Sequence, residues 1–421
     1  MSRLILSWIP AALIAATLFF LGRIVAYHSQ LQIQQHHSGI PVSLRYQNQN
    51  QNDYNDNNDN DNESHSEIEL HAVADAETDA ATVTDDNGIQ QTNITSESSG
   101  NLTTVVNATL GREPLVEIFH DAGVMEVDLA LLLQLPLWTT VQKLYGKGPL
   151  IYGLDQCQAF REATPPEKRR VGPAGLFNTG TNLVSLYLEA NCYFPQHANA
   201  IQWQVPWGKH VMASLRTKHV VTNKHEHDTT LNISTVLPIV TIRDPFYWMQ
   251  SMCRQPYGLK WHHRPQHCPN LVPNEYDYTL YPFPGKNIPV RIALGKEQTT
   301  KWNSMAHLWS DWNLQYFHAT EFPKLMVRFE DLIFYPKQVM TQVCECAGGT
   351  IGKKKKHKFL YNLDSAKFGP GHGTTKTTLA SAMIRYGQDE GRRKKGLTPE
   401  DIALAKDTLD PELMQFFHYN Q

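Results

Sequence analysis

Two stretches of this chain combine an apolar strand, a short polar turn and a helix, and they constrain the fold more than any other feature. The first, Arg170–Cys192, places the turn Asn178–Asn182 between an apolar run and a helical pattern. This arrangement aims backbone N–H groups and the positive end of a helix at an anion. Gly180 permits a close backbone approach, and Thr181 and Asn182 are able to cap the helix. The same pattern also occurs in ordinary turns.

The second stretch, Pro238–Ser251, reads as an apolar strand, the tripeptide Arg-Asp-Pro and a helix. Pro245 falls near the predicted helix start, where its missing N–H costs nothing. Arg243 ends the strand, and its planar guanidinium can hold a phosphate, to which Ser251 adds a hydroxyl. Two anion sites that follow two strands suit a ligand with separated phosphate groups.

At these residues the chain resembles the sulfotransferases that use 3′-phosphoadenylyl sulfate (PAPS). The resemblance pairs a 5′-phosphosulfate loop at Gly175–Asn182 with a 3′-phosphate motif, Arg243 followed by Ser251. It covers Tyr152–Phe417, and the strings RDPFYWMQSMCRQPY, VRFEDLIFYPKQV and LTPEDIALAKDTLDPEL resemble a plant and algal branch. It implies a three-layer, P-loop-like α/β fold with a central parallel sheet flanked by helices. It also implies transfer of a sulfuryl group from PAPS to a hydroxyl acceptor without a metal.

The resemblance also implies a set of site residues. Family members usually carry Lys or Arg where this chain has Asn178, which donates a hydrogen bond but brings no charge. We predict that Lys209 replaces that charge and that His210 is the catalytic base, because imidazole titrates near neutral pH. The alternatives are Glu189 as base, or a Lys-His pair that is only surface. The predicted cofactor-binding residues in the two turns are Asn178, Thr179, Gly180, Thr181, Asn182, Arg243 and Ser251. A late loop adds Lys367 and Lys376, and His372 and Arg385 belong to the same segment.

Strand and helix patterns alternate through the rest of this region. Apolar runs predict strands at Val236–Ile242 and Lys324–Phe329, and Ile201–Ser214 is predicted as a strand with an active-site loop. Helical spacing predicts helices at Trp302–Tyr316 and Lys337–Ala347. Such alternation favours a parallel sheet with right-handed crossovers, whose ligands bind at the carboxyl ends of the strands. Upstream, Val116–Phe119 is strand-like, and a helical pattern interrupted by Pro136 follows it.

The N-terminal part of the chain differs in kind. The apolar run Leu4–Gly22 has the length of a membrane-spanning helix, which favours a retained signal-anchor over a cleaved secretory signal. Residues 28–110 are polar and biased in composition, so we predict a disordered stem between a membrane segment at 1–27 and a catalytic domain at 111–421. The acceptor motif Asn-x-Ser/Thr occurs at Asn62, Asn93, Asn101, Asn107 and Asn232. These motifs favour a lumenal domain of a single-pass Golgi protein.

Charge divides the chain at the same place. Residues 1–109 hold 3 of the 38 Lys and Arg residues and 13 of the 41 Asp and Glu residues, so the remainder has seven more basic than acidic residues. A basic domain fits an anionic donor and an anionic polymer, although a merely solvated basic surface is as common. With a membrane anchor and glycosylation motifs, the expected partner is a glycan or another hydroxyl acceptor and not nucleic acid.

All six cysteines lie in the predicted catalytic domain, and an even number in a lumenal context permits disulfides. We predict the pair Cys253–Cys268, which closes the loop after Arg243. The pair Cys157–Cys192 is also possible on sequence grounds. Cys344 and Cys346 have no partner pair at zinc spacing, which argues against a metal site.

Two further functions compete with sulfuryl transfer. A P-loop NTPase or kinase would carry a Lys in G-x-x-x-x-G-K-[ST], which the turn at Asn178–Asn182 lacks. A sulfotransferase-like protein that binds a nucleotide or glycan without catalysis would explain an uncharged residue at Asn178.

Overall fold

The computed structural model describes residues 107–217, 232–294, 298–352, 358–364, 378–388 and 390–419, all within the unit Gln91–Gln421. The predicted membrane segment at Leu4–Gly22 and nearly all of the predicted stem lie outside these residues. Within the described ranges, no helix combines the length and the apolar composition needed to cross a bilayer.

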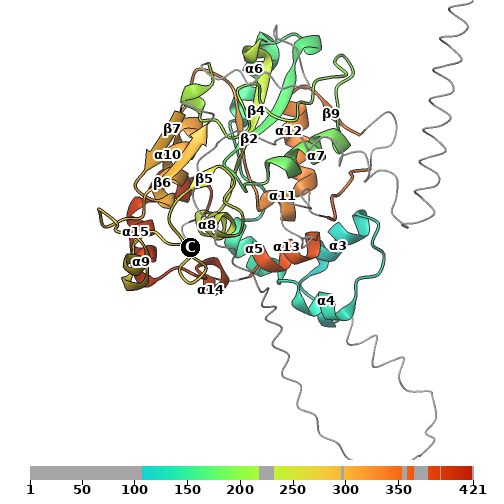
Figure 1. The fold of residues 1–421 in the computed structure, drawn as a ribbon. Coiled ribbons are helices and arrows are strands. Elements are labelled where there is room, and N and C mark those ends of the chain that lie inside the picture. The colour runs from blue at the N-terminus through green and yellow to red at the C-terminus, as the bar shows by residue number, and fades with distance from the viewer. Residues whose placement is uncertain are drawn as a thin grey trace, which may run out of the picture. The chain divides into compact units, whose positions relative to one another are not determined.

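The central sheet has the strand order β1-β8-β4-β2 (Figure 1). Its strands are β1 (Ile151–Tyr152), β2 (Arg170–Gly175), β4 (Val236–Ile242) and β8 (Leu325–Arg328). β2 and β8 run parallel to β4, whereas β1 runs antiparallel to β8. The predicted parallel sheet is therefore a mixed sheet. Every residue of β4 is buried, as expected for a strand with both faces covered.

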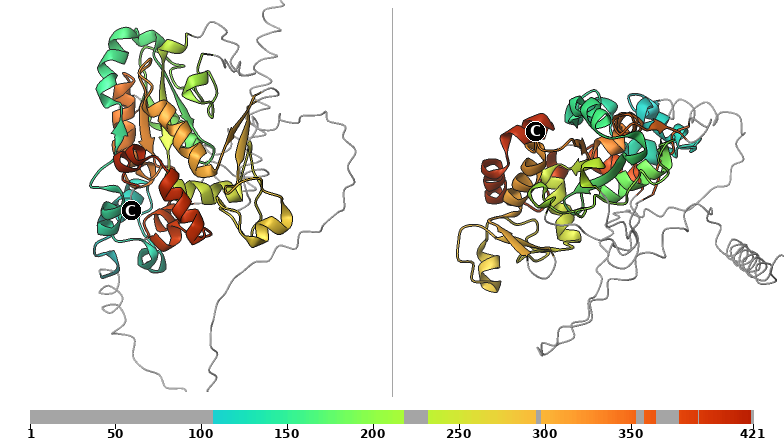
Figure 2. Two further views of the ribbon diagram at one scale, coloured as in Figure 1. Left: turned by 90° about the vertical axis from the view of Figure 1, so that its left-hand side faces the viewer. Right: turned by 90° about the horizontal axis from the view of Figure 1, so that it is seen from above.

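Helices and two smaller sheets make up the rest of the described fold (Figure 2). The α-helices are α3 (Glu113–Asp121), α4 (Leu129–Gln134), α5 (Trp138–Tyr145), α6 (Cys157–Ala163), α7 (Thr181–Asn191), α8 (Pro245–Arg254), α9 (Glu275–Leu280), α10 (Met305–Phe317), α11 (Asp331–Phe334), α12 (Pro336–Cys346), α13 (Leu379–Tyr386), α14 (Glu390–Arg393), α15 (Pro399–Thr408) and α16 (Pro411–Phe416). The short 3₁₀ helices are η2 (Leu154–Gln156), η3 (Pro166–Lys168), η4 (Ala213–Leu215) and η5 (Ile233–Thr235). The remaining strands are β3 (Cys192–Tyr193), β5 (Leu259–Lys260), β6 (Val290–Leu294), β7 (Gln298–Trp302) and β9 (Thr350–Ile351), which pair as antiparallel sheets β3-β9 and β5-β6-β7.

Two apolar cores lie on the two faces of the central sheet. Leu237 and Ile239 of β4 belong to one core, together with side chains of α7 and α12. Val240 and Ile242 belong to the other, with side chains of α8 and α10 and of the β5-β6-β7 sheet. Figure 1 shows β5, β6 and β7 on the opposite side of the central sheet from α7 and α12. The sheet is thus flanked by helices, and β5-β6-β7 extends the second face.

The strand predicted at Val236–Ile242 is confirmed residue for residue as β4, and the one at Lys324–Phe329 is confirmed as β8. Of the strand and loop predicted at Ile201–Ser214, the strand reduces to a single bridge between Ile201 and Val171, and turns follow it. Pro206 and Gly208 interrupt that run, and Gly208 has a positive φ of 98°.

The predicted strand at Val116–Phe119 is also wrong, since these residues lie in α3. The buried side chains of α3 are Leu115, Ile118 and Phe119, a spacing that fits one face of a helix. Downstream, the helical pattern is confirmed as α4 and α5, with Pro136 in the break between them.

The cysteines form three disulfides. The pairs are Cys157–Cys346, Cys192–Cys344 and Cys253–Cys268. The predicted pair Cys253–Cys268 is confirmed, and the alternative Cys157–Cys192 is wrong. Because α12 packs against both α6 and β3, its cysteines at positions 344 and 346 reach different partners.

Candidate functional site

The two predicted turns lie side by side because their strands are neighbours. Gly175 at the end of β2 is paired in register with Thr241 of β4, so both turns leave the same edge of the sheet. Thr179 in the first turn links them, since its Oγ1 lies 2.9 Å from Thr241 Oγ1 and donates to Leu176 O at 2.8 Å. The Thr179 hydroxyl therefore braces the turn.

Gly180 shapes the first turn. Its φ is +91°, and a Cβ at this position would lie 2.3 Å from the ring of Phe329. Gly180 is also the N-cap of α7, and no side chain caps this helix. Thr181 is the first helical residue, so the predicted capping by Thr181 and Asn182 does not occur. The N–H groups of the first turn of a helix lack intrahelical partners, so this helix end suits an anion.

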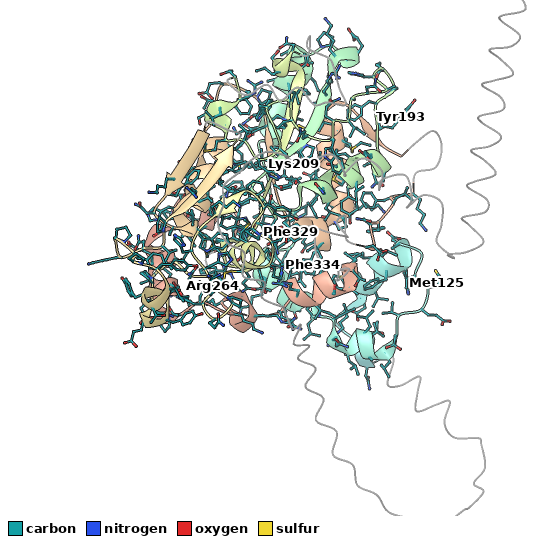
Figure 3. The ribbon with its side chains drawn as sticks, in the orientation of Figure 1. Met125, Tyr193, Lys209, Arg264, Phe329 and Phe334 are labelled. Atoms are coloured by element: carbon teal, nitrogen blue, oxygen red, sulfur yellow. A yellow bond between two sulfur atoms is a disulfide. The ribbon has the colours of Figure 1, made fainter. Side chains whose placement is uncertain are left out.

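Lys209 and His210 lie against this first turn. Lys209 is 8 % exposed, and its Nζ donates to Asn182 Oδ1 at 2.9 Å. Its backbone oxygen accepts a hydrogen bond from Gly175 N at 2.9 Å. Nδ1 of His210 lies 2.6 Å from Gly175 O, which makes Nδ1 the protonated nitrogen and leaves the lone pair of the neutral ring on Nε2. Figure 3 shows Lys209 near the middle of the fold.

Trp203 covers the lysine. Its ring centroid lies 4.1 Å from Lys209 Nζ, while the indole itself is 41 % exposed. On the other side of the turn, the rings of Phe177 and His210 are 4.3 Å apart, and Tyr257 stacks on Phe177. Aromatic rings therefore border both predicted catalytic side chains.

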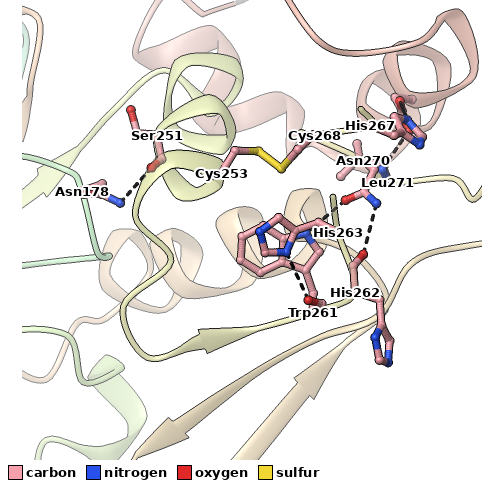
Figure 4. The surroundings of a disulfide bond; sticks show 11 residues. Asn178, Ser251, Cys253, Trp261, His262, His263, His267, Cys268, Asn270 and Leu271 are labelled. Carbon is pink, nitrogen blue, oxygen red and sulfur yellow. Dashed lines mark hydrogen bonds and ion pairs between the residues drawn. A yellow bond between two sulfur atoms is a disulfide. The ribbon is translucent and has the colours of Figure 1, made fainter. Parts of the chain in front are cut away.

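Asn178 connects the first turn to the end of α8. Its backbone has a φ of +60°, a conformation that Asn tolerates better than most residues. Its Nδ2 lies 2.8 Å from Gln255 O and 3.3 Å from Ser251 O, and donates to both carbonyls (Figure 4). Its own carbonyl accepts from Arg243 Nη1 at 2.5 Å. The Asn178 amide thus holds the end of α8, and its carbonyl holds Arg243.

Arg243 leaves the end of β4 and is 5 % exposed. Besides its bond to Asn178, it donates from Nη2 to the hydroxyl of Tyr386. Its guanidinium also lies over the rings of Phe329 and Tyr386, at 4.7 and 5.1 Å from their centroids. Tyr386 belongs to α13, so a C-terminal helix completes this part of the site.

Three arginines converge here. Arg254 at the end of α8 donates from Nη2 to Ser251 Oγ at 2.9 Å, and Arg385 of α13 donates to Gln250 Oε1 at 3.2 Å. Burial, and next the charges of Arg385 and Arg243, lower the pKa of Arg254 to about 10. Burial also lowers the pKa of Arg385, and the charge of Arg243 lowers it further. Such mutual repulsion shows that three positive charges share one small region.

Within the described residues, none of Arg243, Arg254 and Arg385 forms an ion pair with a carboxylate. The buried Nε atoms of Arg243 and Arg385 also lack a hydrogen-bond partner there. Buried guanidinium groups are normally paired. This arginine cluster (Arg243, Arg254 and Arg385) therefore fits a multiply charged anion such as a phosphate.

A network of buried charges holds the second turn in place. Asp244 accepts from the backbone N–H groups of Phe246 and Tyr247 and so caps α8. Its other oxygen lies 2.6 Å from Arg393 Nε. Glu330 accepts from Asp244 N at 3.1 Å and from Tyr419 Oη at 2.9 Å.

Burial and the neighbouring charge of Asp244 raise the pKa of Glu330 to about 7.

Ser251 is 4 % exposed, and its Oγ donates to Tyr247 O. The structure therefore brings together nearly all of the predicted site. Lys367, His372 and Lys376 lie outside the described residues.

Sequence reasoning missed Arg254 and Tyr386. Arg254 follows Ser251 by three residues, a helical spacing that places both side chains on one face of α8, so the signal was present. Tyr386 lacked any such local signal, because α13 is 143 positions away from Arg243 in the sequence.

No family model, curated protein or solved structure matches the chain. In the described part of the chain, no three His, Cys, Asp or Glu side chains are grouped as a metal site would require.

Proposed function

We propose that this protein is a sulfotransferase with a three-layer, P-loop-like fold that moves a sulfuryl group from PAPS to a hydroxyl of a carbohydrate. The arginine cluster carries the proposal. Arg243 directly follows β4, the strand next to β2. The cluster has no carboxylate partner among the described residues, and two of its buried N–H groups lack hydrogen-bond partners there. A phosphate matches these donors, because its three terminal oxygens carry negative charge and accept hydrogen bonds. We assign this cluster, with Ser251, to the 3′-phosphate of the donor.

The first turn supplies the second anion site. Lys209 lies beside the N-terminus of α7, which has no side-chain cap, because Lys209 Nζ contacts Asn182 at the start of that helix. We assign this place to the 5′-phosphosulfate. Lys209 then provides the positive charge that Asn178 does not.

The reaction requires an acceptor, a base and a stabilised leaving group. The acceptor oxygen forms a bond to sulfur while the bond from sulfur to the bridging oxygen breaks, and its electron pair leaves with the 5′-phosphate. Lys209 and the α7 N-terminus stabilise the negative charge on that phosphate. His210 accepts the hydroxyl proton at Nε2, because its Nδ1 proton is engaged with Gly175 O.

A second candidate function follows from Asn178. Its amide is directed to carbonyls of Ser251 and Gln255, where it holds the turn. A protein that binds the nucleotide without transferring sulfate would keep these contacts. Binding of the desulfated donor without transfer to any acceptor would favour this candidate.

The cellular setting is part of the proposal. Three disulfides among the described residues fit an oxidising compartment. Together with the apolar N-terminal run, they support a single-pass Golgi protein with a lumenal catalytic domain. Protease protection of the domain in intact vesicles tests this orientation, and cleavage without detergent would contradict it.

The deciding experiment is calorimetric binding of 3′-phosphoadenosine 5′-phosphate to the full-length chain in detergent. Arg243→Ala removes a charged partner of the phosphate, so we expect affinity to fall by about tenfold or more. Ser251→Ala is expected to weaken binding less. Arg264→Ala, an exposed arginine outside the site, is the matched control and should bind like the wild type.

Equal binding by wild type and Arg243→Ala, with both proteins folded, would overturn the assignment of the 3′-phosphate site. Transfer of labelled sulfate from PAPS to glycan acceptors then separates the two candidate functions. His210→Ala should abolish transfer while leaving nucleotide binding intact.

A further inference from the structure

A row of three basic side chains crosses the β5-β6-β7 sheet. Lys260 of β5 is paired in register with Arg291 of β6, and Arg291 is paired with Lys301 of β7. All three side chains are exposed. Their neighbours Leu259 and Ile292 are each 1 % exposed and pack in the core on the opposite face. Burial of that face sets the register, and the register aligns the basic row (Lys260, Arg291 and Lys301).

Like charges directly opposite each other on a sheet destabilise it. In the described part of the chain, none of the three side chains forms an ion pair or a hydrogen bond with a neighbour. Neighbouring strands lie about 4.8 Å apart, so the row extends over about 10 Å. A single small anion spans less than this distance, whereas an extended polyanion offers charges along it.

Aromatic and basic side chains continue the surface beyond β5. The alternation of exposure along the chain leaves His262 and Arg264 exposed, like Lys260. The ring of His262 lies 4.1 Å from that of Tyr281, and the guanidinium of Arg264 lies 5.8 Å from the same Tyr281 ring. Figure 4 shows His262 directed away from the stacked rings of Trp261 and His263.

Hydrogen bonds and a disulfide fix the segment that carries His262 and Arg264. Asn270 accepts from Trp261 Nε1 at 3.0 Å and donates to the His262 carbonyl at 3.1 Å. The disulfide Cys253–Cys268 closes the segment onto α8. The surface is therefore built on a strand pair and a cross-linked loop, which keeps its side chains in place.

We infer that the basic row, together with His262 and Tyr281, binds an acidic polysaccharide. The cations complement carboxylate or sulfate groups along the polymer, and the flat rings present apolar faces on which sugar rings can stack. An anionic lipid surface would also fit the cations, so binding to vesicles is measured as the alternative. Nucleic acid is disfavoured by the disulfides and glycosylation motifs, which indicate an exported domain. The inference uses no residue of the donor site, so it stands or falls independently of the proposed sulfuryl transfer.

The test measures binding of the full-length chain in detergent to polygalacturonate and to dextran sulfate across a range of salt concentrations. Neutral dextran, single-stranded DNA and phosphatidylserine vesicles are measured in parallel. Combined substitution of Lys260→Gln, Arg291→Gln and Lys301→Gln should weaken polysaccharide binding by at least about tenfold and reduce the slope of log K against log salt by about three. The matched control substitutes exposed lysines elsewhere: Lys147→Gln, Lys168→Gln and Lys406→Gln.

A second variant, His262→Ala with Tyr281→Ala, probes the aromatic flank. It should weaken polysaccharide binding several-fold and leave vesicle binding unchanged. Equal losses in the basic-row variant and its control would overturn the inference, because overall charge alone would then explain binding. Preference for DNA or vesicles over both polysaccharides would overturn it as well. Because removal of opposed like charges does not destabilise the sheet, thermal unfolding of the basic-row variant should match or exceed the wild type.

Discussion

The two strand–turn–helix units look alike in sequence but are stabilised in different ways. In the first, after β2, the backbone conformations of Asn178 and Gly180 shape the turn, and the N-terminus of α7 has no side-chain cap. In the second, after β4, Asp244 caps α8 and is ion-paired with the buried Arg393. The first unit therefore offers the start of its helix to a ligand.

The second unit closes the start of its helix and presents side chains instead. Arg243 lies before the helix, and Ser251 and Arg254 lie near its end. The same local topology can thus build an anion site from backbone dipoles or from guanidinium groups. Four substitutions test this difference, and we give them from the largest expected effect to the smallest.

Asp244→Ala should have the largest effect, because it removes the cap of α8 and leaves the charge of Arg393 buried without its partner. We expect a loss of about 3–5 kcal/mol in the free energy of unfolding, measured by chemical denaturation. Asp410→Ala is the control, since Asp410 caps α16 and forms no ion pair among the described residues. Its removal should lower the free energy of unfolding by only about 1 kcal/mol. Similar losses in the two variants would show that the ion pair with Arg393 contributes little.

Gly180→Ala should destabilise by about 2–4 kcal/mol, combining the cost of a positive φ with a clash against the Phe329 ring. Gly123→Ala separates the two terms, because Gly123 has a φ of +93° but no atom within 4 Å of the added Cβ. Only the conformational cost of about 1 kcal/mol is expected there. Thermal unfolding of both variants makes the comparison, and equal losses would argue against the clash.

Glu330→Gln tests the charge network through pH. The folded pKa of Glu330 is about 7 against an ordinary value of 4.5, so its stabilising contribution is present below about pH 4.5 and lost as pH rises through 7. The wild type should lose about 1–3 kcal/mol over this range that the variant does not lose. Unfolding free energies measured from pH 4.5 to 8 provide the check. Parallel curves for the two proteins would mean that Glu330 does not titrate in this window.

Asn178→Ala should have the smallest effect on stability, about 1–2 kcal/mol, since it removes partly buried hydrogen bonds and adds the strain of a positive φ. Asn178→Gly removes the same bonds without that strain and should lose less. Both variants should weaken nucleotide binding several-fold, because the amide positions the Ser251 end of α8. Unchanged binding in the glycine variant would show that the two turns act independently.

Local patterns were sufficient for the central strands and for the two turns. β4 is apolar except for Thr241 and ends at an Arg-Asp-Pro sequence that starts a helix, so its bounds follow from the residues themselves. The same reasoning failed at Val116–Phe119, where the short run Val-Glu-Ile-Phe fits a strand or a helix equally well. It also failed for the strand part of Ile201–Ser214, where proline and glycine follow a single bridge.

Contacts between distant segments could not be predicted in this way. Cys344 and Cys346 are only two positions apart, but each pairs with a residue more than 150 positions away, and the choice depends on the packing of α12. Likewise, the position of Lys209 beside Asn182 depends on the path of the segment that follows α7 along the edge of β2.

The sequence by itself therefore determined the alternation of strands and helices, the two polar turns and the residues Arg243 and Ser251, because these depend on periodicity and on short-range backbone preferences. Only the tertiary structure decided that Arg254 and Tyr386 join Arg243, that the Asn178 amide holds α8, and that Lys260, Arg291 and Lys301 form one row. Each of these depends on which segments pack side by side. That choice is made by burial summed over whole elements, which no local pattern of residues encodes.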